Sequence, residues 1–115
     1  MTRRLRAALP RQTEIVTDVR LTTHGISITV HGDLDLHTAA SLEEQLGEAV
    51  REGERLIEVH LDDVNSLDSV GLGVLVAARN AQLRAGGTLE LVCSQPQPLR
   101  VLRSTGVDRV LTVHS

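Results

Sequence analysis

The sequence contains no Phe, Trp or Tyr, so its interior has to be built from aliphatic side chains. Leu, Val, Ile and Ala pack well, but they offer no flat ring on which a nucleic-acid base can stack. Binding of single-stranded nucleic acid or of a flipped base therefore loses its commonest anchors.

Lysine is also absent, because all 12 basic residues are arginine. This excludes a Walker A lysine, a Schiff-base lysine and a lysine general base. Four of the arginines lie within the first eleven residues, whereas all 15 acidic residues come later. The larger part of the chain is therefore acidic, which argues against direct binding of nucleic acid and for a protein partner with a basic surface.

Cysteine occurs once, at Cys93, within an apolar run. A single chain then has neither a disulfide nor a cysteine-based zinc site, and a reducing, cytoplasmic setting is expected. No apolar stretch approaches the ~18 residues of a membrane span, and the first residues have too short an apolar part for a signal peptide. We expect a soluble protein with no membrane partner.

The candidate metal ligands are three histidines, His31, His37 and His60. None of them is spaced four residues from another on a predicted helix, so surface or hydrogen-bonded histidines are the better interpretation. We expect neither a metal nor a cofactor.

With 115 residues, the chain is long enough for one domain with its own core. Residues 1–12 are basic, contain Pro10 and show no sustained period, so we expect a mobile tail followed by a domain over residues 13–115. Alternating apolar residues predict a hairpin from residues 17–21 and 26–31. Residues 55–61, 88–93 and 108–113 predict further strands, the last at a sheet edge.

Helical spacing separates these strands. The first predicted helix opens at His37 or Thr38 and buries Leu42, Leu46 and Val50 or Ala49. A second helix begins at residues 68–71 and ends at residues 86–87. A short third helix follows, with Pro96 and Pro98 in its first turn. In the second helix, we expect the core side to carry Leu72, Leu75, Val76 and Leu83. Strands that alternate with helices predict an α/β fold with a mixed sheet of four to five strands.

The start of the second helix carries the candidate site. Asp68 and Ser69 are preferred helix starters, and a helix N-terminus favours an anion, so a phosphate on Ser69 would be well placed. Gly71 and Gly73 each weaken a helix by roughly 0.5–1 kcal/mol relative to Ala, which suggests a surface kept open for a partner. The alternative is that Asp68 or Ser69 only caps the helix and the glycines only permit tight packing.

Other chemistry is poorly supported. The glycines of Gly71-Leu72-Gly73 lack the third glycine of a dinucleotide-binding loop, and Ser69 has only half of the G-x-S-x-G turn of a hydrolase. Asp35 is either an ordinary turn carboxylate or part of a site at the carboxyl edge of the sheet.

Three segments together resemble the STAS domain family and, within it, the bacterial anti-sigma factor antagonists. GDLDLHTAASLEEQL is similar to the family's strand exit, LIEVHLDDVNSLDSVGLGVLV to its strand, D-S-x-G-L-G turn and helix, and STGVDRVLTV to its closing segment. They follow one another in the family's order over residues 17–113.

The resemblance implies a partner-switching cycle. In that family, the unphosphorylated antagonist binds an anti-sigma factor that is also a serine kinase, and this binding frees a sigma factor. The kinase phosphorylates the motif serine, and a serine phosphatase removes the phosphate. The phosphoacceptor would be Ser69. The partner-binding residues would be Asp35, Asp68, Ser69, Val70, Gly71 and Gly73. The chain would be no enzyme, and it would be monomeric when free.

Two positions depart from the family pattern. Val70 stands where Ser or Thr is common, which leaves Ser69 as the only acceptor in the turn, and His60 stands where Asp is common, which changes the polarity of that strand. A STAS subunit of another assembly, such as a stressosome-like scaffold or a transporter, is the alternative. A small hydrolase that uses Ser69 is a third hypothesis.

Overall fold

The computed structural model describes residues 14–115, which form a five-stranded sheet in the order β1-β2-β3-β4-β5. The strands are β1 (Val16–Leu21), β2 (Gly25–His31), β3 (Leu56–Asp63), β4 (Thr88–Val92) and β5 (Val113–His114). β1 and β2 are antiparallel, whereas the other neighbours are parallel. The predicted α/β fold with a mixed sheet is confirmed, and the predicted tail lies outside the described residues.

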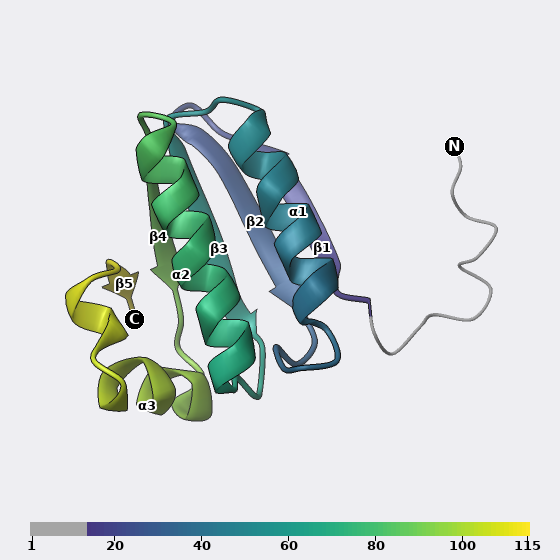
Figure 1. The fold of residues 1–115 in the computed structure, drawn as a ribbon, viewed down its shortest axis with the longest axis vertical. Helices are drawn as coiled ribbons and strands as arrows, with labels where there is room; N and C mark the ends of the chain where they lie inside the picture. The colour runs from purple at the N-terminus through teal and green to yellow at the C-terminus, as the bar shows by residue number, and fades with distance from the viewer. Residues whose placement is uncertain (1–13) are drawn as a thin grey trace, which may run out of the picture.

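Two helices cover one face of the sheet. α1 (Ala39–Arg51) connects β2 to β3, and α2 (Ser69–Arg84) connects β3 to β4. Figure 1 shows them side by side on the same face, as expected when right-handed crossovers advance in one direction along a sheet. α3 (Pro96–Ser104) lies beyond the end of the sheet at which α2 begins.

The core lies between this face and the two helices. In β2 the covered face carries Ile26, Ile28 and Val30, each at most 3% exposed, as the alternation predicts. The core is completed by inward-facing residues of β3 and β4 and by the inner side of α1. The strand residues are Ile57, Val59, Leu61, Leu89 and Leu91, and the helix residues are Leu42, Leu46 and Ala49. Burial of these aliphatic side chains is the main stabilising contribution in a chain without aromatic residues.

The core side of α2 differs from the prediction. Leu75 is fully buried, but Val76 is only partly buried and Leu83 is 43% exposed. The buried residues of α2 are Gly71, Leu72, Leu75, Ala78 and Gln82. The prediction followed the large apolar residues, whereas the inward line includes Gln82, whose Nε2 donates to the Glu54 carbonyl (2.8 Å).

The predicted last, short strand at a sheet edge is present, but its predicted bounds, residues 108–113, are wrong. A 3₁₀ turn at Val107–Arg109 follows α3, and β5 is reduced to Val113–His114, at the sheet edge. Gly106 adopts a φ of 80°, and the Leu111 N–H then donates to the carbonyl four residues earlier (2.8 Å). Leu111 is 1% exposed, so this segment buries its apolar residues at helical rather than strand spacing.

The other face of the sheet is polar. Histidines pair with carboxylates on it: His31 with Asp18 (2.9 Å) and Asp63 (3.0 Å), His60 with Glu58 (3.3 Å) and His114 with Glu90 (2.9 Å). Within residues 14–115, no group of three or more His, Cys, Asp or Glu is placed to hold a metal ion. None of the helices in this part of the chain has the length and apolar character needed to cross a membrane.

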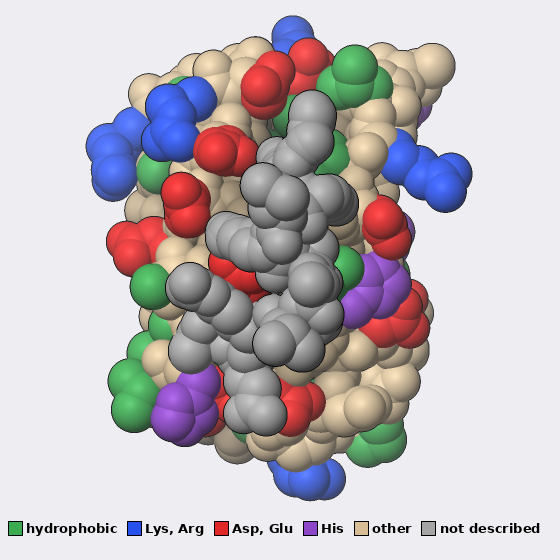
Figure 2. Space-filling view, turned by 90° about the vertical axis from the view of Figure 1, so that its right-hand side faces the viewer, with side chains coloured by type: hydrophobic (Ala, Val, Ile, Leu, Met, Phe, Trp, Pro, Cys, Tyr) green, Lys and Arg blue, Asp and Glu red, His purple; other side chains and the backbone are tan. Residues whose placement is uncertain are grey.

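The side of the molecule next to β1 and α1 is acidic. Figure 2 shows this side, with acidic side chains spread across it and arginines toward its outline. The exposed glutamates of α1, Glu43, Glu44 and Glu48, contribute to this charge.

Candidate functional site

The candidate site lies where two loops meet at the carboxyl ends of β2 and β3. The Leu34 N–H donates to the Ser66 carbonyl (2.9 Å), and the Asp68 N–H donates to the Leu34 carbonyl (3.0 Å). Leu34 and Leu67 form a parallel bridge, and both are buried. The loop after β2 is therefore fastened to the start of α2, at the sheet edge where α/β folds place their sites.

Asp68 is the residue that caps α2. Its Oδ1 accepts hydrogen bonds from the N–H groups of Val70 (2.9 Å) and Gly71 (3.0 Å), and its Oδ2 accepts one from the N–H of Leu36 (3.3 Å). One carboxylate thus caps the helix and holds the neighbouring loop. Ser69, the first residue of α2, is exposed, and within residues 14–115 its hydroxyl has no hydrogen-bond partner.

The two glycines near the start of α2 serve different purposes. A methyl group on Gly71 would lie 2.7 Å from the Leu34 carbonyl oxygen, which is closer than van der Waals contact. Gly71 is buried, so its missing side chain lets α2 approach the loop. Gly73 is exposed, and a methyl group there would meet no atom of the described chain within 4 Å. Tight packing explains Gly71, and Gly73 leaves the surface open.

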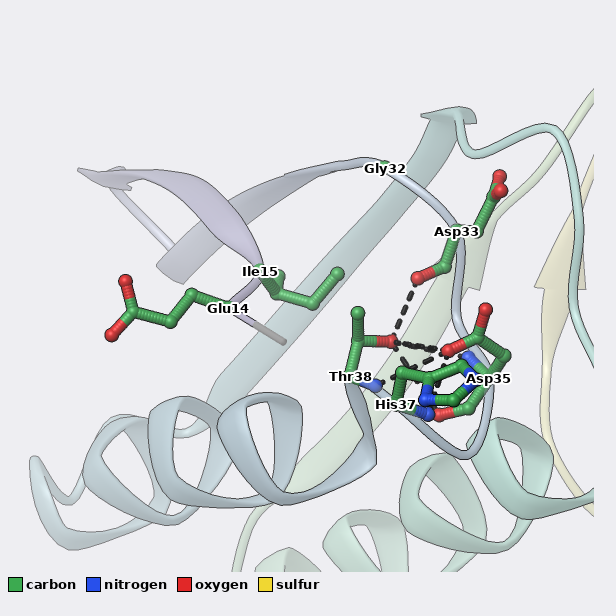
Figure 3. A pocket seen from close by; sticks show the side chains of 7 residues that line it. All are labelled: Glu14, Ile15, Gly32, Asp33, Asp35, His37 and Thr38. Carbon is green, nitrogen blue, oxygen red and sulfur yellow. Dashed lines mark hydrogen bonds between the residues drawn. The ribbon is translucent and has the colours of Figure 1, made fainter. Parts of the chain in front are cut away.

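Asp35 shapes the loop that leads into α1. Its Oδ1 accepts hydrogen bonds from the N–H groups of His37 (2.9 Å) and Thr38 (3.2 Å). Thr38, which is buried, donates its hydroxyl to the Asp33 carbonyl (2.7 Å). Figure 3 shows this network beside a hollow of about 430 Å³. The carboxylate of Asp35 therefore acts as a turn-forming group.

That hollow is lined by Glu14, Ile15, Gly32, Asp33, Asp35, His37 and Thr38. Its three carboxylates make it unsuitable for an anion, and Ser69 is not part of its lining. The chemistry that the sequence predicts is therefore presented on an open surface, which suits contact with another protein better than binding of a small substrate.

Leu36 is a residue of this surface that no sequence pattern indicates. This side chain is 67% exposed, and its backbone is held beside the first turn of α2 by Asp68. Val70 in that turn is 41% exposed. Two exposed aliphatic side chains therefore belong to the two segments that meet at the start of α2.

Gln97 is a second residue that the sequence did not indicate. Its Oε1 accepts a hydrogen bond from the Leu67 N–H (2.8 Å), and its Nε2 donates to the Leu67 carbonyl (3.1 Å). The amide thus holds both backbone groups of the residue before Asp68. α3 supports the site through this pair of bonds.

The unusual His60 lies on the polar face of the sheet, paired with Glu58. α2, and with it Ser69, covers the other face. The altered polarity at His60 therefore concerns the face opposite to the candidate site.

Comparison with known proteins agrees with the geometry. The STAS domain family matches residues 13–115. An anti-sigma-B factor antagonist of Bacillus subtilis (strain 168) is 29% identical over 99 residues, which cover 86% of this chain and 90% of that protein. The corresponding antagonist of Staphylococcus aureus (strain NCTC 8325 / PS 47) is 31% identical over 87 residues, or 76% of this chain and 81% of that protein.

Structural similarity points the same way. The crystal structure of an anti-sigma factor antagonist from Mycobacterium paratuberculosis matches with a TM-score of 0.81 and 27% identity, over 92% of this chain and 90% of that one. The hydrogen-bonded turn at Asp68-Ser69 and the sheet order both fit the family that these matches indicate. The chain belongs to the STAS domain family, in its group of anti-sigma factor antagonists.

Proposed function

We propose that this protein binds an anti-sigma factor serine kinase while Ser69 is unphosphorylated, and thereby frees a sigma factor. Phosphorylation of Ser69 by the kinase ends the interaction, and a serine phosphatase restores it. The observation that carries this proposal is the exposed hydroxyl of Ser69 at the start of α2. Because Asp68 does the capping, modification of Ser69 breaks no hydrogen bond that the helix needs.

The proposed contact surface consists of two kinds of residue. The kinase contacts Ser69, the exposed side chains of Leu36 and Val70, and the open backbone at Gly73. The residues that hold this surface in place are Asp35, Asp68 and Gly71. An apolar centre with a polar rim is the usual anatomy of a protein–protein interface.

A phosphate on Ser69 acts through charge. It adds about −1.5 to −2 charges, and two N–H groups of the first turn, those of Val70 and Gly71, are already bonded to Asp68. The helix dipole favours the phosphate by roughly 0.3–1 kcal/mol, and the neighbouring carboxylate opposes it. The fold should tolerate this balance. At the partner surface, like charges and desolvation can cost several kcal/mol, and each ~1.4 kcal/mol weakens binding tenfold.

The test is incubation with candidate anti-sigma factor kinases and ATP, followed by intact-mass measurement. We expect one phosphate on the parent protein and none on Ser69→Ala, which should still bind the kinase. Ser104→Ala is the control, since Ser104 is also an exposed helix serine but lies at the end of α3 and should leave phosphorylation unchanged. A phosphate that remains on Ser69→Ala contradicts the proposal.

The absence of phosphorylation by every kinase tested would favour a STAS subunit of another assembly. A hydrolase would instead be captured by a serine-reactive probe. We expect no capture, because within residues 14–115 no histidine hydrogen-bonds the Ser69 hydroxyl to act as its base. We propose that the protein acts by binding and not by catalysis.

The mechanism is expected to be local. Backbone amide shifts recorded before and after phosphorylation should change in the first turn of α2 and in residues 32–37, which the Asp68 carboxylate and the Leu34 backbone join to it. Ser69→Asp should bind the kinase poorly and melt near the parent temperature. Shifts spread across the sheet would show that phosphorylation instead rearranges the domain.

A further inference from the structure

β1 lies at one edge of the sheet formed by residues 14–115, and half of its backbone groups face away from β2. The Thr22 N–H donates to the Gly25 carbonyl (2.7 Å), so Thr22 directs its backbone toward β2. Backbone groups alternate in direction along an antiparallel strand. Thr17, Val19 and Leu21 therefore direct their N–H and C=O groups outward.

Ile15 shows how far this edge is already closed. Its N–H donates to Ser41 Oγ (3.0 Å), and its carbonyl accepts from Gln45 Nε2 (2.7 Å). Both partners belong to α1, which thus satisfies the outward groups just before β1. From Thr17 onward, no hydrogen bond within residues 14–115 occupies the outward edge.

The side chains along this edge are exposed and apolar. Val19 is 60% exposed and Leu21 75%, and both line a groove of about 320 Å³ between β1 and α1. Edge strands commonly carry Pro, Lys or a bulge that prevents pairing, but β1, with the sequence VTDVRL, has none of these. Its two charged residues, Asp18 and Arg20, have opposite signs and lie on the polar face.

We propose that β1 pairs antiparallel with β1 of a second copy of this chain, about a two-fold axis at Val19. In this register, Val19 faces its counterpart and Thr17 faces Leu21, so every outward residue exchanges backbone hydrogen bonds. On the polar face, Asp18 of each copy faces Arg20 of the other. Cross-strand pairs of opposite charge stabilise a sheet, and the edge of this strand is self-complementary.

The neighbouring registers are disfavoured by the same residues. An axis at Asp18 places two aspartates opposite each other and requires Ile15, whose backbone groups are already bonded to α1. An axis at Arg20 places two arginines opposite each other. Like charges directly opposite are destabilising in a sheet, so the axis at Val19 is the one that the sequence of β1 selects.

The dimer departs from the monomer expected from the sequence. Glu48 and Glu52 also line the groove, so association brings acidic groups of the two copies closer and should be weak and concentration-dependent. The acidic side seen in Figure 2 would face the second copy. Because the two-fold axis reverses the strand direction, the two Ser69 turns would point to opposite ends of the dimer and remain accessible (Figure 1).

Sedimentation equilibrium of the full chain over a wide concentration range tests the proposal. Asp18→Arg and Arg20→Asp each place like charges opposite one another in both halves of the interface, and each should weaken association about tenfold or more. The double variant exchanges the charges and should restore it. Asp108→Arg, a reversal at an exposed residue in the 3₁₀ turn, is the control and should leave association unchanged.

Val19→Pro gives a second line of test. It removes an outward N–H without removing a hydrogen bond to β2, so the domain should stay folded while the dimer is lost. A full chain that is monomeric at every concentration overturns the proposal, as does a double charge variant that melts like the parent yet stays monomeric. Dimerisation that appears only after residues 1–12 are deleted would assign the edge to the chain's own N-terminal segment and equally overturn it.

Discussion

Gly71→Ala tests whether the close contact between α2 and the loop after β2 positions the candidate site. The new methyl group would meet the Leu34 carbonyl oxygen at 2.7 Å, and the Leu34 carbonyl carbon and Cβ at 2.9 Å each. Two of these atoms belong to the backbone, and Leu34 is buried and bonded to Ser66 and Asp68. The loop can make room only by shifting as a whole, and overpacking of this kind typically costs about 1–3 kcal/mol.

Gly73→Ala is the matched control, because it makes the same exchange two positions along the same helix where a methyl group meets open space. Both variants gain roughly 0.5–1 kcal/mol from removing a helical glycine. The difference between their free energies of unfolding in urea therefore isolates the contact with Leu34, and we expect Gly71→Ala to be the less stable by about 1–3 kcal/mol. Equal stabilities would refute this account of the site.

Three further predictions concern the domain. Leu75→Ala, at a fully buried position, should cost about 2–5 kcal/mol in urea unfolding, and an unchanged midpoint would show that α2 packs through another face. Burial raises the pKa of the Cys93 thiol, so iodoacetamide should label the native protein slowly and the unfolded protein rapidly; equal labelling rates would contradict this. For the same reason, the free energy of unfolding should fall as the pH rises above the pKa of the unfolded thiol. Deleting residues 1–12 should change the unfolding free energy by less than about 0.5 kcal/mol, and a loss above ~1 kcal/mol would show that they pack on the domain.

The parts of the fold that the sequence predicts correctly are those with local signals. The alternation of Ile26, Ile28 and Val30 identifies the covered face of β2 because strand side chains alternate in direction. The bounds of the last strand are predicted wrongly because this segment does not alternate. Val107 and Leu111 face the core at helical spacing, and only two residues remain in the strand. In α2, periodicity of large apolar residues is misleading because Gln82 occupies a buried position through a hydrogen bond to a distant carbonyl.

The site divides in the same way. The helix start at Asp68 and the placement of Ser69 follow from capping chemistry, which acts within three residues. The contacts of Leu36 with Asp68 and of Gln97 with Leu67 join residues 32 and 30 positions apart, so no local pattern contains them. Sequence reasoning could therefore name the serine and its neighbours in the first turn of α2, but not Leu36 or Gln97.

The last prediction separates the residues that build this surface from those that a partner contacts. Asp68→Ala removes the helix cap and releases Leu36, so it should lower the unfolding free energy by about 0.5–2 kcal/mol and weaken kinase binding as well. Leu36→Ala truncates an exposed side chain, so it should change stability by less than about 0.5 kcal/mol while costing more than about 1 kcal/mol in binding. Urea unfolding and titration with the kinase measure the two quantities. If Leu36→Ala binds like the parent, the apolar neighbours of Ser69 lie outside the contact, and the interaction has to rest on the serine and the helix backbone.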